Sequence, residues 1–481
     1  MHRRHDLSWL KVATPERTIM HLAAMVMASS LAGSPECGLQ HEIDALSADL
    51  RAFERSRSQG ALDAERANEI RAIVKDALAD AGTRTLMQVG SDGPFEGDNF
   101  YRLDATGTEI SSADGNFRYH LNVQMQLRFV WNHREDLGDT QGFENPRTRF
   151  IMDGHAFGKE WRYALQLSRP GGVPSPRVPD IEDAWVGRVL SPELQLKMGQ
   201  FRPYFTREEM LPSATTTFME RSALNNYFRA ARSRGIALEW ETEHFMWRSG
   251  WFDGITVRSP STPGGADWNT GNTVNLPWDN SLAIDWAFSS RFDWKLNGTW
   301  RELREYTPWL DMEGQATNLG VAVDAEKASP SAPFPADPWM IEVTADLMHK
   351  QAGWSLYTWG VFRRVQSDDG QSNQWGALVQ ASTMLAERWE TGLRYSIGDS
   401  GADSDAAYPM LSLLELNLSH YIHGHSMKVQ LDVGYSFEGL SANNLGNGFA
   451  TPGASLLPDV QPPAGDVSGQ MYVGIQYQVL F

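Results

Sequence analysis

The feature of this sequence that most constrains its fold is a strict alternation of apolar and polar residues that begins at Phe117. In the stretch FRYHLNVQMQLRF, residues 117–129, the odd positions are apolar or aromatic and the even positions are polar or basic. Successive side chains of a β-strand point to opposite faces, so this stretch predicts a strand with one apolar and one polar face. Segments with the same period recur as far as residue 481, and we expect about sixteen such strands.

The segments between the expected strands alternate between short and long. Short gaps fall near 158–160, 191–193, 243–244, 291–292, 349–353, 385–388 and 421–425, and long polar gaps fall near 131–146, 170–181, 203–232, 255–280, 303–337, 365–373, 398–409 and 438–470. Bacterial outer-membrane barrels have short turns at one end and longer loops at the other, whereas a soluble sandwich has no reason to keep this order. The sequence therefore predicts an all-β, transmembrane antiparallel β-barrel over residues 117–481, wide enough to enclose an aqueous channel.

Alternation alone does not say whether the apolar faces point into a packed core or outward into lipid. Arginines on the polar faces and tryptophans near strand ends, such as Trp131 and Trp161, favour lipid contact. The stretch QMYVGIQYQVLF, residues 470–481, is apolar on one face only, and we expect it to close the sheet against the first strand. The alternative is a secreted β-rich binding or structural protein whose apolar strand faces form a core.

The composition and the N-terminal region narrow the class and location of the protein. The net charge of −18 argues against a nucleic-acid partner, which would need a basic surface. Residues 1–32 carry early positive charge, an apolar run from Ile19 to Ala28 and small residues ending at Ala32, and they predict a signal peptide. The remaining chain has no apolar run long enough for a spanning helix, so a membrane location implies a barrel.

Residues 38–82 have a helical rather than a strand period. Leu39, Ile43, Leu46, Leu50 and Phe53 follow the spacing of a coiled-coil seam, so we expect a periplasmic helical or coiled-coil segment. An amphipathic helix lying on the rest of the protein fits the same pattern. Residues 83–116 contain the Gly- and Asp-rich stretch GSDGPFEGDN and are expected to be a linker.

The stretch from Leu194 to Trp240 resembles the phosphate-selective porin O and P family. The residues that carry the resemblance are Gly199, Gln200, Phe201, Pro203, Phe205, Glu208, Glu209, Phe218, Glu220, Arg221, Arg234 and Gly235. The resemblance implies a sixteen-stranded homotrimeric porin whose third long loop folds inward and narrows the pore. It does not by itself imply that phosphate is the solute.

Charged residues of the expected inward loop are the candidates for the pore constriction. They are Arg202, Arg207, Glu208, Glu209, Glu220, Arg221, Arg229, Arg232 and Arg234, and the candidate pore-wall residues are Arg118, Arg128, Arg149, Arg162 and Lys197. The arginines could hold an anion by bidentate contacts, or they could pair with the three glutamates and fix the loop to the wall. Both roles remain open at the level of the sequence.

Catalytic and metal sites have weak support. The stretch HYIHGHS, residues 420–426, brings together His420, His423, His425 and Ser426, but it falls in an expected short turn and has no carboxylate or Cys beside it. We therefore expect no enzyme activity, no metal and no cofactor.

The sequence as a whole predicts a porin of the bacterial outer membrane. We expect passive diffusion of small polar or anionic solutes, phosphate among the candidates, with a modest anion preference set by the inward loop. The expected partners are outer-membrane lipid and the barrel-assembly machinery, which would bind the C-terminal strand.

Overall fold

A computed structural model describes residues 101–104, 107–134, 138–170, 180–230, 232–254, 257–258, 268–269, 284–328, 339–367, 370–401, 410–440 and 469–481. The chain divides into two compact units, residues 1–95 and 96–481. The expected signal peptide, residues 1–32, and the expected helical segment, residues 38–82, lie outside the described residues.

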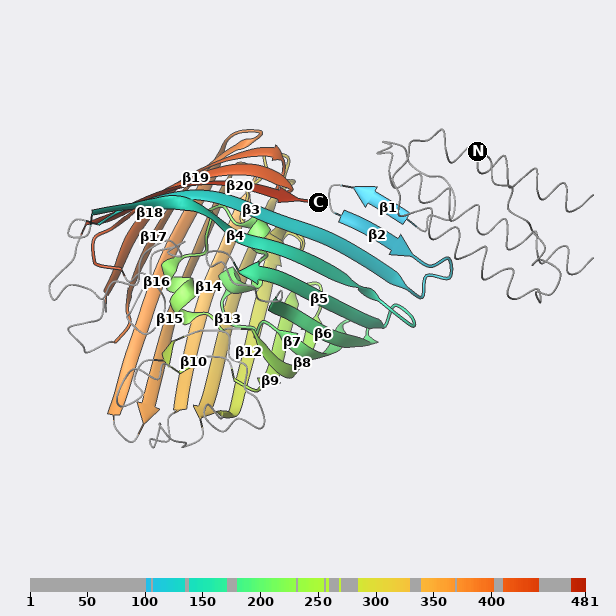
Figure 1. The fold of residues 1–481 in the computed structure, drawn as a ribbon. Helices are drawn as coiled ribbons and strands as arrows, with labels where there is room; N and C mark the ends of the chain where they lie inside the picture. The colour runs from blue at the N-terminus through green and yellow to red at the C-terminus, as the bar shows by residue number, and fades with distance from the viewer. Residues whose placement is uncertain are drawn as a thin grey trace, which may run out of the picture. The chain divides into compact units, whose positions relative to one another are not determined.

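Sixteen antiparallel strands close into a β-barrel (Figure 1). They are β3 (Arg118–Arg134), β4 (Gly138–His155), β5 (Trp161–Pro170), β6 (Asp180–Ser191), β7 (Leu194–Phe201), β8 (Ser233–Glu241), β9 (Phe245–Phe252), β12 (Ile284–Asn297), β13 (Gln315–Ala328), β14 (Trp339–Gln351), β15 (Trp354–Ser367), β16 (Gly370–Ala386), β17 (Trp389–Asp399), β18 (Met410–His423), β19 (Met427–Ser436) and β20 (Gln470–Leu480). Strand β20 pairs with β3 from Met471↔His133 to Leu480↔Gln124, which confirms the expected closure of the last strand against the first.

The polar strand faces point into the barrel and the apolar faces point outward. On β3 the inward residues Asn122, Gln124 and Arg128 are buried, whereas the outward Leu127 is 48% exposed. Outward aromatic and aliphatic side chains are exposed on strand after strand, as expected for a surface in contact with lipid. This orientation rules out the alternative in which the apolar faces form a packed core.

Several expected loops are wrong. Strands β3 and β4 run through most of residues 131–146, and the connection between them is only 135–137. The expected turn at 291–292 lies inside β12, while β13 occupies the middle of the expected loop 303–337. Residues 368–369 connect β15 to β16 where a longer loop, 365–373, was expected. Period-two patterns continue across these positions, and polar residues such as Asn132, Glu144 and Gln374 are buried strand positions rather than loop residues.

Two short hairpins accompany the barrel. Strand β1 (Tyr101–Asp104) pairs with β2 (Gly107–Ser111), and β2 pairs with the start of β3. These residues were expected to belong to the linker 83–116, so the sheet begins earlier than the sequence predicted. Strand β10 (Val257–Arg258) pairs with β11 (Trp268–Asn269).

The two ends of the barrel differ as the sequence predicted, apart from the short connections 135–137 and 368–369 at the end with the longer loops and one long connection at the other end. At one end, here called the turn end, most connections are short: 156–160, 192–193, 242–244, 352–353, 387–388 and 424–426. The exception is the connection from β12 to β13, residues 298–314. The opposite end, here called the loop end, includes the connection 202–232. Within the described part of the chain, helices are too short or too polar to cross a membrane.

Candidate pore constriction

Residues 202–232, here called the constriction loop, connect β7 to β8 and fold into the barrel (Figure 1). The loop contains α4 (Arg207–Met210), η2 (Ser213–Thr215) and α5 (Ala223–Phe228). Side-chain caps start both α-helical turns: the hydroxyl of Thr206 accepts from the Glu209 amide, and that of Ser222 accepts from the Asn225 amide. These bonds satisfy backbone amides at the start of each helical turn.

The loop contacts inward faces on all sides of the barrel. Ser213 Oγ accepts from Arg149 of β4 at 2.8 Å, and Arg291 of β12 donates to the Phe205 carbonyl at 2.9 Å. Lys428 of β19 donates to the Thr216 carbonyl at 2.7 Å. Buried apolar side chains of the loop, Phe205, Leu224, Tyr227 and Phe228, form one cluster with wall residues such as Phe252 of β9 and Tyr357 of β15. The loop therefore crosses the lumen and narrows it.

Arg207 and Arg221 hold the loop in place. Arg207 is buried and pairs with Asp293 of β12 and Asp346 of β14, each at 2.9 Å. Arg221 donates to the Glu208 carbonyl at 2.6 Å and to the Leu211 carbonyl at 2.8 Å, so it ties two parts of the loop together. Both guanidinium groups are engaged in contacts within the protein.

The Glu208 carboxylate is also engaged in contacts within the protein. Its carboxylate accepts from the amide of Ser222 at 2.9 Å and from the hydroxyl of that residue at 2.7 Å. The guanidinium of Arg394 on β17 approaches it at 3.7 Å. Glu208 therefore joins α4 to the start of α5 and to the wall.

One carboxylate, Glu209, is shared by three arginines. Its oxygens lie 3.1 Å from Arg202, 3.4 Å from Arg221 and 3.5 Å from Arg229. Burial alone would raise the pKa of Glu209, but these guanidinium groups hold it well below its usual range. The pKa of Arg202 is lowered by burial and by neighbouring Arg232. This group, here called the Glu209 cluster, carries more positive than negative charge.

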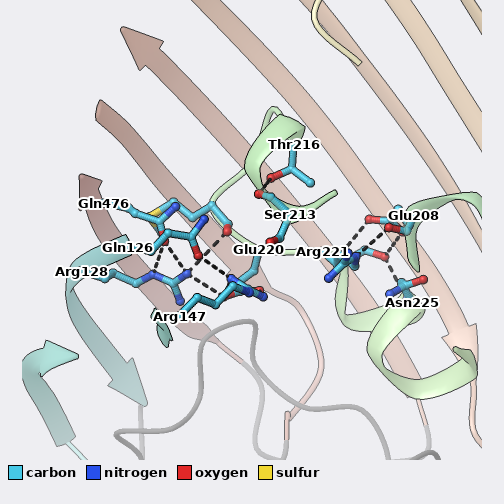
Figure 2. Close-up of polar contacts among 12 residues, drawn as sticks. Gln126, Arg128, Arg147, Glu208, Ser213, Thr216, Glu220, Arg221, Asn225 and Gln476 are labelled. Carbon is cyan, nitrogen blue, oxygen red and sulfur yellow. Dashed lines mark hydrogen bonds and ion pairs between the residues drawn. The ribbon is translucent and has the colours of Figure 1, made fainter. Parts of the chain in front are cut away.

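Glu220 lies between Arg128 and Arg147 (Figure 2). Both guanidinium groups approach its carboxylate to 2.6 Å, and Arg128 also pairs with Glu144 at 3.0 Å. Although burial would raise the pKa of Glu220, the two arginines hold it well below its usual range. The loop tip is thereby joined to β3 and β4.

Two β-bulges place further charges in the lumen, and sequence reasoning missed them. On β4, Asn145 and Pro146 together face one residue of β3, which lets both Glu144 and Arg147 point inward. On β6, Glu182 is the extra residue, and it pairs with Arg149 at 3.0 Å and Arg232 at 2.8 Å. A Pro within a strand pattern, as in ENPR, is the one sequence signal that indicates a bulge.

The remaining predicted wall residues lie on inward faces. One of the predicted constriction residues, Arg234, does not. Arg118 pairs with Glu109 at 2.8 Å, Arg162 donates to Gln195 at 3.3 Å and Lys197 lies 3.4 Å from Glu239. Arg234, expected at the constriction, is instead exposed on the outward side of β8, in line with Ile236 and Leu238. It follows Ser233, which takes the inward position, so strand alternation turns Arg234 away from the lumen.

Burial of the inward residues differs between the two halves of the wall. From β14 to β20, inward side chains such as Gln374, Glu390, Ser419 and Gln476 are fully covered. From β5 to β8 and in the constriction loop beside them, charged side chains keep some exposure: 20% for Asp183, 26% for Glu239 and 29% for Arg229. The water-accessible path therefore follows the β5–β8 side, past the Glu209 cluster.

The histidine group at residues 420–426 has structural contacts. His425 lies 2.9 Å from Glu305, and the His420 ring packs on Trp389. Within the described ranges, no group of three or more His, Cys, Asp or Glu side chains has the arrangement of a metal site.

A closed barrel with outward apolar faces and a charged inward loop defines an outer-membrane channel of the porin class, through which solutes diffuse passively. Residues 117–276 match the family model described as phosphate-selective porin O and P, in agreement with the resemblance found in the sequence. The match includes the constriction loop and strands β3 to β9. No curated protein matches the chain significantly.

Solved structures of outer-membrane proteins match about three quarters of the chain. OmpT of Vibrio cholerae is 10% identical, with 76% of this chain and 98% of that chain covered and a TM-score of 0.47. The anion-selective porin from Comamonas acidovorans is 12% identical, with 76% and 99% covered and a TM-score of 0.48. The outer membrane channel DcaP of Acinetobacter baumannii is 9% identical, with 77% and 99% covered and a TM-score of 0.48.

Proposed function

We propose that the channel passes small polar solutes and prefers anions at low salt, with inorganic phosphate among the candidate anions. The observation that carries this proposal is the Glu209 cluster, where three arginines share one carboxylate. Of these, Arg202 and Arg229 keep 16% and 29% of their side-chain surface exposed, whereas Glu209 keeps 4%. A permeating ion meets the guanidinium groups before it meets the carboxylate.

The preference is expected to be weak. Each arginine of the cluster already has a carboxylate partner, so an anion must compete with Glu209 rather than fill an empty site. Exposed charges are also screened beyond roughly 8 Å at physiological ionic strength. The arrangement therefore supports an attraction that fades with added salt, and it gives no support to a high-affinity phosphate site.

The double variant Arg202→Gln, Arg229→Gln tests the proposal. It leaves Glu209 with Arg221 alone, so the excess positive charge disappears while the arginines that pin the loop remain. Each lost unit charge, at roughly 8 Å in water, changes the energy of an anion by about 0.5 kcal/mol and that of a cation by as much in the opposite sense. The anion-to-cation permeability ratio should therefore fall at least about fivefold. Reversal potentials in a salt gradient across a planar bilayer measure this ratio.

Arg234→Gln is the control, because it makes the same kind of substitution, with loss of one positive charge, on the outward side of β8 and should leave the reversal potential unchanged. If the double variant kept the selectivity of the unchanged protein, the Glu209 cluster would not be the selectivity element. Tight block of the chloride current by micromolar phosphate would show that the proposal underrates phosphate binding.

We further propose that the channel is a homotrimer, that residues 38–82 help its subunits associate, and that barrel-assembly machinery binds the C-terminal strand. The support is the seam of Leu39, Ile43, Leu46, Leu50 and Phe53 and the apolar alternation of residues 470–481. Deleting residues 39–78 should leave the single-channel conductance unchanged but lower the temperature at which oligomers dissociate on a gel. Loss of all conductance in correctly inserted protein would indicate that this segment gates the pore instead.

A further inference from the structure

The connection between β12 and β13, residues 298–314 and here called the turn-end segment, is long at an end of the barrel where other described connections are short. It begins with a capping pair in which the Thr299 amide and hydroxyl donate to Glu302 at 2.7 and 2.8 Å. A single helical turn, η4 (Glu302–Arg304), follows. Leu303, Tyr306 and Thr307 of the segment are buried.

The segment is fixed to both sides of the barrel mouth. On one side, Trp300 donates from its indole nitrogen to the Thr242 carbonyl, at the turn between β8 and β9, at 2.8 Å. On the other side, the ring of Trp309 packs against Tyr421 and His425, at the turn between β18 and β19. In the closed strand order these two turns lie on opposite sides of the ring, so the segment crosses the mouth.

Polar contacts hold the middle of the segment down. Lys350 of β14 donates to the carbonyls of Glu305 and Thr307, both at 3.2 Å. The Thr307 hydroxyl donates to Glu390 of β17 at 3.3 Å, and the Glu305 carboxylate lies 2.9 Å from His425. These partners belong to the wall from β14 to β19, and the inward side chains of that wall are the fully covered ones.

The turn-end segment also touches the constriction loop. Arg207 donates to the Leu303 carbonyl at 3.4 Å, and the Thr215 hydroxyl donates to the Arg304 carbonyl at 3.3 Å. The loop that enters from one end of the barrel thus rests on the segment that enters from the other. Displacing the segment would remove support beneath α4 and η2.

We propose that the turn-end segment is a second constriction element, which closes the mouth over strands β9–β18 and directs solutes out along the β3–β8 side. This inference rests on the channel function and is independent of the proposed anion preference. It assigns a specificity role to Trp309 and Thr307, whose contacts keep the turn-end segment across the mouth of the barrel. Solutes that leave along the open side pass Lys197 and Arg162.

Thiol accessibility tests the inference in a Cys37→Ser background. Arg162→Cys places a thiol on the open side, and Ser382→Cys places one beside Glu390, the carboxylate that also accepts from Thr307; Ser382 is now 5% exposed. A charged maleimide added at the turn end of the inserted protein should label position 382 at least about tenfold more slowly than position 162, because thiol reactivity requires access. Equal labelling rates would overturn the inference.

Removing the turn-end segment is the complementary experiment. Replacing residues 299–313 by Asn-Gly should raise the labelling rate at position 382 to that at position 162. Because the turn-end segment covers one side of the mouth, the replacement should also raise the single-channel conductance roughly twofold. Trp309→Ala, which detaches only the far anchor, serves if the replacement does not fold, and it should raise the rate at 382 without changing that at 162. Unchanged rates in folded Trp309→Ala would also overturn the inference. If the unchanged protein conducted ions without preferring anions, that result would contradict the proposed anion preference but not the role of the turn-end segment.

Discussion

Deletion of residues 470–481 is expected to abolish assembly of the barrel. Strand β20 pairs with β19 on one side and with β3 on the other, so its loss opens the sheet at two edges. Lipid offers no hydrogen-bond partner, and each exposed backbone group then costs several kcal/mol. Heat-modifiable mobility on a gel and recovery from the outer-membrane fraction measure the folded barrel, and we expect neither for the deletion.

Phe481→Ala is the matched control for this deletion. It keeps the backbone bonds between Phe481 and Val123, at 2.7 and 3.0 Å, and removes only the terminal ring. We expect it to fold in detergent, while any loss confined to cells would point to recognition of the C-terminal strand by the assembly machinery. Recovery of a folded, membrane-inserted barrel from the full deletion would contradict the closure seen between β20 and β3.

Asp293→Asn should be the most destabilising single substitution in the lumen. The Asp293 carboxylate accepts from Arg207, Arg248 and Arg291 at 2.7 to 2.9 Å, and it is 2% exposed. Removing its charge leaves the guanidinium groups of Arg207 and Arg291 buried with Asp346 alone, and breaking a buried ion pair typically costs about 3–5 kcal/mol. We expect a lower unfolding temperature in detergent and noisier single-channel currents, because Arg207 fixes the constriction loop.

Asp311→Asn makes the same chemical change at an exposed position and should leave both measurements unchanged. A wild-type unfolding temperature for Asp293→Asn would show that water or another acceptor replaces the carboxylate. In that case Arg207 could not be regarded as the anchor of the loop.

Much of the fold follows from the sequence, because strand alternation is a local property. The inward positions of β3 and the closing role of β20 were both readable from period two. The bulges were not, since one extra residue at Glu182 changes the face of its neighbours without a strong local signal. The expected turn at 291–292 failed for a related reason: Arg291 and Asp293 are charged because they pair inside the barrel, not because they face solvent in a turn.

The sequence by itself determined the barrel and the two faces of its strands, because side-chain period and connection length are local properties of the chain, and the inward loop was implied by the resemblance of residues 194–240 to a porin family. Only the tertiary structure decided which arginines remain available to a solute. Arg207 pairs with Asp346, 139 positions away, while Arg229 shares Glu209 with two other arginines and keeps its exposure. Such partners come together only when the wall closes around the loop, and burial beside a carboxylate, rather than residue type, separates an anchoring arginine from one that meets an ion.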